Sequence, residues 1–106
     1  TKKDLSELVM DLGSDRSRFM REASRARKYG IKLIVLCEHG KGIMKLTDVQ
    51  FWENPMLDSK SKLYRPKAMT GKTLMKRMID IHIGYGTEFL FCEKSETGAR
   101  IIELLE

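Results

Sequence analysis

The chain has 106 residues, 42% of them hydrophobic and 33% charged, and its 20 lysines and arginines exceed its 15 acidic residues. This composition excludes a disordered chain, and no apolar run approaches the roughly 20 residues of a membrane-spanning helix. We therefore expect one domain that has no membrane partner. Because these residues contain no basic-then-apolar leader, we also expect an intracellular location in the cytoplasm, nucleoid or nucleus.

The positive charge is concentrated in two blocks. Residues 16–32 carry five arginines and two lysines against Glu22 alone, and residues 59–77 carry seven basic residues and no acid. Either block alone is equally well explained as the solvated surface of a helix. Together they favour one positive face, which is the pattern of a site for a polyanion.

The first predicted helix covers residues 4–12. Its apolar residues Leu5, Leu8 and Leu12 recur at helical spacing, and Gly13 follows as a stop signal. This predicted helix directly follows Lys2 and Lys3, so the two lysines lie before the first predicted helix.

A second helix is predicted from a cap at Ser14 or Asp15 to Tyr29, with Gly30 closing it. Three small or aromatic residues form its core stripe, and the arginines repeat on a different face. Glu22 falls between the two stripes, at the edge of the core. The core stripe consists of Phe19, Ala23 and Ala26.

The segment "IKLIVLC" at 31–37 is a near-continuous β-favouring run and predicts a strand covered on both faces, as in a parallel sheet. Farther along, "LTDVQFW" contains Thr47 with Gln50 three residues on, a capping-box pattern that predicts a short helix. Residues 53–69 show no periodicity and predict a long loop, which in a small domain is usually functional or mobile.

The last part of the chain alternates again. Thr70 is expected to cap a long helix that ends near Ile83, residues 87–92 form a second buried strand, and Ser95 or Thr97 begins a final helix. Alternating helices and strands indicate an α/β fold with parallel strands joined by right-handed crossovers. Two strands are too few for a stable sheet, so we expect additional strands before Thr1.

The two cysteines, Cys37 and Cys92, each end an apolar run and lack metal-ligand spacing. They are interpreted as small buried hydrophobes in a reducing compartment, with a disulfide left open because both could end neighbouring strands. The segment "GKT" at 71–73 lacks the earlier glycine of a phosphate-binding loop and is interpreted as a helix start.

Four segments, taken in order, resemble the XPF-type nuclease domain of the PD-(D/E)XK superfamily. They are "TKKDLSEL", "DRSRFMREASRARKYGIKLIVLCE", "LTDVQFWENP" and "EFLFCEKSETGARIIELL". The resemblance extends over nearly the whole chain and rests on the order and spacing of modest motifs. It implies a restriction-endonuclease-like three-layer α/β/α fold whose N-terminal strands are missing from this chain.

The resemblance implies a site at the start of the chain. In that family an acid-X-Lys triplet ends a strand before the first helix. Carboxylates on adjacent strands hold Mg²⁺ or Mn²⁺, and the lysine stabilises the charge that builds on phosphorus. Here Thr1 would supply a backbone carbonyl to the metal, Lys2 would be the catalytic lysine, and the acid would precede Thr1. In an alternative register Lys3 is that lysine, Thr1 replaces the acid, and the site is inactive.

Two further sets of residues follow from the resemblance. Glu22 would aim its carboxylate at the catalytic site, although a pair with Arg18 or Arg25 within the helix is the more ordinary role for a glutamate there. Basic side chains of the second helix and of the long loop would contact DNA phosphates. This set comprises Arg16, Arg18, Arg21, Arg25, Lys60, Lys62, Arg65 and Lys67.

The sequence thus predicts a metal-dependent DNA endonuclease domain, structure-selective as the resemblance implies. The alternative is a non-catalytic DNA-binding or partner-binding module of the same fold. An enzyme acting on a phosphorylated small molecule is a third class, which the lack of a glycine-rich turn disfavours. Homodimers and heterodimers are common in the family, so a dimer is an arrangement to test.

Overall fold

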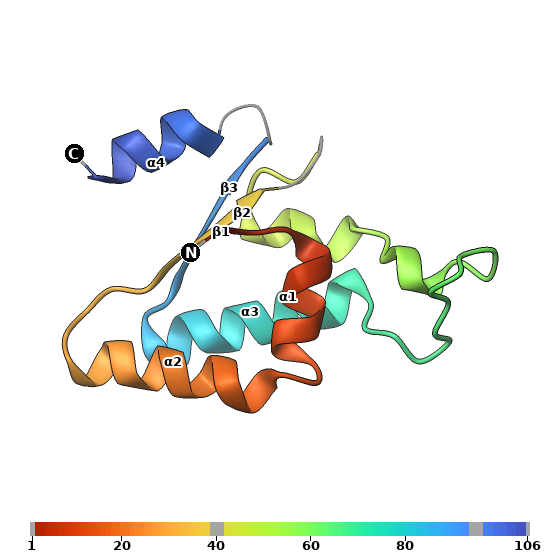
Figure 1. Ribbon diagram of the computed structural model, residues 1–106, viewed down its shortest axis with the longest axis horizontal. Coiled ribbons are helices and arrows are strands. Elements are labelled where there is room, and N and C mark those ends of the chain that lie inside the picture. The colour runs from red at the N-terminus through yellow and green to blue at the C-terminus, as the bar shows by residue number, and fades with distance from the viewer. Residues whose placement is uncertain (1, 39–41, 94–96, 106) are drawn as a thin grey trace.

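A parallel sheet of three strands runs through the centre of the computed structural model, which describes residues 2–38, 42–93 and 97–105 (Figure 1). The strands are β1 (Lys2–Lys3), β2 (Ile34–Glu38) and β3 (Glu88–Cys92). Four α-helices and two short 3₁₀ helices connect and flank them. The α-helices are α1 (Leu5–Leu12), α2 (Arg16–Lys28), α3 (Gly71–Tyr85) and α4 (Thr97–Leu105), and the 3₁₀ helices are η1 (Leu46–Phe51) and η2 (Pro55–Leu57).

The strand order is β1-β2-β3, and both neighbouring pairs are parallel. Lys3 lies opposite Cys37 in the first pair, and Phe89 lies opposite Val35 in the second. The predicted α/β class and the parallel pairing are confirmed. The third strand is formed by Lys2 and Lys3 themselves, which join β2 as an edge strand only two residues long.

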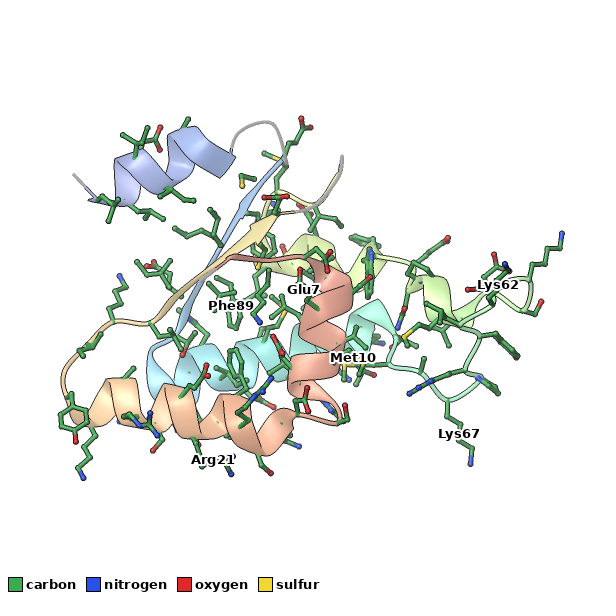
Figure 2. The ribbon with its side chains drawn as sticks, viewed as in Figure 1. Glu7, Met10, Arg21, Lys62, Lys67 and Phe89 are labelled. Atoms are coloured by element: carbon green, nitrogen blue, oxygen red, sulfur yellow. The ribbon has the colours of Figure 1, made fainter. Side chains whose placement is uncertain are left out.

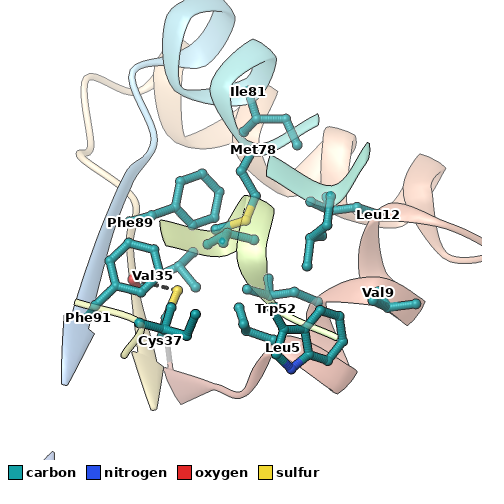
Figure 3. Close-up of a cluster of buried hydrophobic side chains, with 14 of the residues drawn as sticks. Leu5, Val9, Leu12, Val35, Cys37, Trp52, Met78, Ile81, Phe89 and Phe91 are labelled. Carbon is teal, nitrogen blue, oxygen red and sulfur yellow. Dashed lines mark hydrogen bonds between the residues drawn. The ribbon is translucent and has the colours of Figure 1, made fainter. Parts of the chain in front are cut away.

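One hydrophobic core joins the sheet to α1, α2, α3 and η1 (Figure 3). Leu5, Leu8, Val35, Leu74 and Met78 are completely buried within it. The strand predicted at 31–37 corresponds to β2. Its predicted burial on both faces is confirmed, because Val35, Leu36 and Cys37 are consecutive and all buried. In Figure 1, α4 lies on the opposite side of β3 from the other three helices.

Local capping explains where α1 begins and where α2 ends, whereas Asp15 precedes α2 without a side-chain cap bond. Asp4 caps α1 through a capping box with Glu7, in which the Asp4 side chain accepts a bond from the Glu7 amide at 2.8 Å. Gly30, at a φ of 66°, closes α2 with a Schellman pattern, since Ile31 donates to Ala26 and Gly30 to Arg27. These bonds engage residues 30 and 31, so β2 begins at Ile34 rather than at residue 31 as predicted.

The predicted capping box at Thr47 is wrong. Thr47 lies inside η1, whose N-cap is Lys45, and the Gln50 side chain donates back to the Thr47 carbonyl at 2.9 Å. The carboxylate of Asp48 instead accepts a bond from the Met44 amide at 3.1 Å. Asp48, and not Thr47, is thus the side chain that accepts a backbone hydrogen bond near the start of η1.

The predicted loop at 53–69 is largely irregular but is tied at its base. Asn54 is buried, caps η2 by accepting from the Met56 amide, and donates to the Met69 carbonyl at 2.8 Å. A second bond joins the Arg65 amide to the Met56 carbonyl at 2.7 Å. The loop therefore leaves and re-enters the body at neighbouring points.

Thr70 caps α3 as predicted, by accepting a bond from the Thr73 amide at 3.2 Å. The helix continues to Tyr85, two residues beyond the predicted end, and stops at Gly86 in the left-handed region. The final helix begins at Thr97, one of the two predicted starts, whereas Ser95 lies outside the described residues.

The cysteines remain thiols and form no disulfide. Cys37 lies opposite Phe91 and Cys92 lies opposite Glu38, so the two side chains are on different faces of the sheet. Burial, with a smaller contribution from Cys92, raises the pKa of Cys37 from 9.0 to about 12. Cys37 therefore stays protonated near neutral pH and is a packing residue rather than a nucleophile.

Within the described ranges, no helix is both long enough and apolar enough to span a membrane.

Candidate functional site

The predicted catalytic segment lies at the edge of the sheet. Thr1 is outside the described residues, and so is the side chain of Lys2, although the backbone of Lys2 pairs with β2 opposite Leu36. The roles predicted for Thr1 and Lys2 stay predictions. What the structure supplies is their context, a parallel edge strand followed at once by the capped helix α1.

A cavity of about 180 Å³ lies beside this strand, between α1, α2 and the start of β2. Lys3 of β1 and Glu22 of α2 both line it, although they are distant in the sequence. Asp11, Asp15 and Arg18 supply the other charged groups, and Phe19, Leu33 and Val35 complete the lining. The alternative lysine and the predicted acid therefore border one cavity.

Lys3 is held in this cavity by an ion pair. Its Nζ lies 3.1 Å from Oδ2 of Asp11, and the exposed fractions of the two side chains are 26% and 11%. The contact is electrostatic, because no hydrogen bond of acceptable geometry reaches this buried oxygen. Lys3 therefore compensates the charge of an acid that the fold has removed from water.

Glu22 is exposed, and within the part of the chain that the structure describes it has no ion pair within 4.0 Å. The helical pair with Arg18 or Arg25 that the sequence suggested is absent. Arg18 instead approaches Asp15, with 3.8 Å between Nη2 and Oδ2. The carboxylate of Glu22 thus lines the cavity without being committed to a neighbouring cation.

The acids of the described residues do not gather into a metal-binding cluster. Mg²⁺ and Mn²⁺ prefer several oxygen ligands, and no group of three or more acidic, histidine or cysteine side chains among the described residues is placed to hold a metal ion. Of the acids around the cavity, Asp11 is already paired with Lys3.

The predicted DNA-contacting residues are all exposed. Arg16, Arg18, Arg21 and Arg25 lie on α2, and Lys60, Lys62, Arg65 and Lys67 lie on the loop between η2 and α3. In Figure 2, Arg21 and Lys67 extend from the same side of the molecule, away from the sheet, whereas Lys62 points outward at the far end of the loop. The cations of α2 and those at 60–67 thus come from different elements, although Arg21 and Lys67 face the same side of the molecule.

Two residues of the cavity, Asp11 and Asp15, were not among the predicted site residues. A signal for Asp11 is present in the sequence, because it falls three residues after Leu8 and directly before Leu12, on the apolar stripe of the first helix. An acid at such a position requires a buried partner. Lys3, eight residues earlier, is brought to it only by the turn from β1 into α1.

Comparison of the chain with protein-family models, with curated proteins and with solved structures finds no match.

Proposed function

We propose that this chain is part of a metal-dependent DNA endonuclease domain with a restriction-endonuclease-like arrangement. The observation that carries the proposal is the position of the opening segment. Lys2, which the resemblance aligns with the lysine of the acid-X-Lys triplet, pairs through its backbone in a parallel edge strand that leads directly into α1, and Glu22 of α2 lines the cavity beside that strand. This order of elements supports the proposal.

In this proposal the chain contributes phosphate binding and charge stabilisation. Lys2 would place its ammonium group near the phosphorus under attack and stabilise the developing negative charge. The exposed arginines of α2 would bind neighbouring backbone phosphates and orient the strand. A divalent metal, when bound, would polarise the phosphodiester.

Cleavage of branched and linear DNA by the protein that carries this chain, in Mg²⁺ or Mn²⁺ and in excess chelator, tests the proposal. We expect metal-dependent nicking, and we expect Lys2→Ala to lower the cleavage rate by about 100-fold or more, as for loss of one charge-stabilising donor. DNA binding by the variant should persist. Lys45→Ala is the matched control, because Lys45 is an exposed lysine near η1, outside this cavity.

The outcomes separate the two functions. Unchanged cleavage by Lys2→Ala would remove that lysine from the mechanism. Tight DNA binding with no cleavage by the native protein in either metal would favour the non-catalytic module. The observation in favour of that second function is the engagement of Lys3 with Asp11, together with the lack of a ligand cluster among the described residues.

A further inference from the structure

A groove separate from the cavity beside β1 lies between α1, the loop after η2 and the first turns of α3. Its volume is about 390 Å³. Val9 and Met10 come from α1, Met56 and Met69 from the two ends of the loop, and Arg77 from α3. Small ligands occupy clefts of this size, roughly 300–1,000 Å³.

The charge of the groove has one sign. Arg65, Lys67 and Arg77 line it, and no carboxylate does. Three other cavities on the described surface each carry at least one acid, namely Glu22 beside β1, Glu103 beside α4 and Asp58 beside η2. The groove is thus suited to an anion, whereas the cavity beside β1 has charged groups of both signs.

Three methionines, Met10, Met56 and Met69, form an apolar part of the groove's lining, which we call the methionine floor. Met10 is 40% exposed although it lies on the helix that forms the centre of the core, and Met56 and Met69 are half-buried. Methionine side chains adapt to flat rings and make favourable contacts between sulfur and aromatic groups. A simple inorganic anion would leave this floor uncovered, whereas a ligand with both an anionic and a flat apolar part would cover floor and cations together.

The walls of the groove are held by bonds that link the elements. Arg77 Nη1 donates to the Leu12 carbonyl at 2.5 Å, which joins α3 to the end of α1. The Asn54 side chain donates a hydrogen bond to the Met69 carbonyl, and the Arg65 amide donates one to the Met56 carbonyl. Figure 2 shows Met10 on α1 and Lys67 on the neighbouring loop, the two labelled residues of the groove. The groove is therefore largely formed before a ligand arrives.

We propose that this groove binds one unpaired nucleotide of a nucleic-acid strand, with the base on the methionine floor and the phosphate near Arg65 and Lys67. Single-strand binding elsewhere combines a positive groove with a surface on which bases lie. The inference rests on the proposed action on DNA and sharpens it, because a base can reach the floor only where it is not paired in a duplex.

Met10→Glu tests the proposal by placing an acid on the floor at an exposed helical position. Affinity for a fluorescent short oligothymidylate should fall by about ten-fold, in the range of losing one base contact. Affinity for a blunt duplex should not change. Met10→Leu, which keeps the floor apolar, should bind as the native protein does. Met44→Glu is the control for charge, since Met44 is exposed and lies beside α4.

Competition identifies the ligand chemistry. Thymidine monophosphate should displace the oligonucleotide at concentrations at which inorganic phosphate and a polyglutamate peptide do not. Native affinity in folded Met10→Glu would overturn the inference, and so would an equal loss of duplex binding or equal competition by phosphate or polyglutamate. Cleavage is measured separately. If Met10→Glu loses single-strand affinity and the native protein shows no nuclease activity, the groove proposal stands and the enzyme proposal fails. If the native protein cleaves DNA and Met10→Glu binds single strands normally, the enzyme proposal stands and the groove proposal fails.

Discussion

Lys3 has surroundings that suit a structural role. Lys3 is engaged with Asp11, and the acid is nearly buried on the core side of α1. A lysine that compensates a buried acid has a structural role whether or not a reaction takes place nearby. In the alternative register, in which Lys3 takes the place of the catalytic lysine, this pairing with Asp11 occupies its ammonium group.

Lys3→Met is expected to lower the free energy of unfolding by about 1–3 kcal/mol, because it leaves the charge of Asp11 uncompensated in a buried place. The loss should be below that of a fully buried pair, since Lys3 is partly exposed. Adding Asp11→Asn should restore part of the stability. Urea denaturation of the single and double variants measures the coupling.

The exposed pair of Lys32 with Glu88 is the matched control. Its atoms are 2.8 Å apart, but the side chains are 62% and 36% exposed. Lys32→Met should therefore change stability by less than about 1 kcal/mol. Equal losses at Lys3 and Lys32, or a double variant that is no more stable than Lys3→Met alone, would contradict a buried compensating role for Lys3.

At the scale of elements, the start of α3 is the most constrained junction outside the sheet. Gly71 is the first residue of the helix and is buried against the end of η1. A Cβ atom built there would lie 2.4 Å from the Trp52 carbonyl oxygen and 2.5 Å from that of Val49. The glycine is required by this close approach of two backbones and not by its own dihedral angles.

Gly71→Ala is expected to destabilise the protein by about 1–3 kcal/mol, because the backbone contacts cannot yield as a flexible side chain would. Gly84→Ala in the same helix is the matched control. It meets nothing within 4 Å, and alanine favours helix by up to about 1 kcal/mol. Thermal or urea unfolding of both variants measures the difference. A Gly71→Ala protein as stable as Gly84→Ala would mean that α3 and η1 are not packed this closely.

At the scale of the whole molecule, the charge is divided by region. The exposed cations of α2 lie near a cavity that also carries acids, whereas the loop cations border a groove without acids. The single positive face expected from the sequence stays a prediction, and the cations of α2 and of the loop after η2 are the two parts of it to test. A long nucleic acid could contact both, and each would add to the dependence of affinity on salt.

Binding to a long DNA should weaken with salt, with a slope of log K against log salt of about −0.9 for each phosphate neutralised. Arg21→Ala and Lys67→Ala should each reduce that slope by about one, and the double variant by about two. Lys32→Ala is the control, because Lys32 is already paired with Glu88. Anisotropy titrations over a range of salt measure the slopes. A flat dependence, or no change in both variants, would contradict the assignment of these cations to phosphate contacts.

Most helices and strands follow from the pattern of residues, for reasons that are local. Apolar spacing at Leu5, Leu8 and Leu12 produced α1, and the threonine before Gly71 marked the start of α3. The boundaries that differed did so because of bonds that spacing does not show. The Schellman closure around Gly30 delayed β2, and the Asp48 carboxylate replaced Thr47 as the local acceptor near η1.

The neighbours of the site residues depend on contacts between distant segments. The placement of Glu22 beside the strand of Lys3, and of Met10 beside Lys67, required α1 to turn back across the ends of α2 and α3. No periodicity within a segment encodes such a distance. The one long-range partner that the sequence signalled was that of Asp11, because an acid on an apolar stripe must be compensated.

Residue order alone predicted the α/β class, the parallel strands and the exposed basic side chains, because hydrophobic patterning and the alternation of helices with strands indicate the class of fold, and charged side chains remain in water. Tertiary packing decided that Lys3 pairs with Asp11 and that Glu22 has no ion-pair partner among the described residues. Those outcomes depend on how the helices and strands pack against each other. Only this packing brings a buried charge next to its partner.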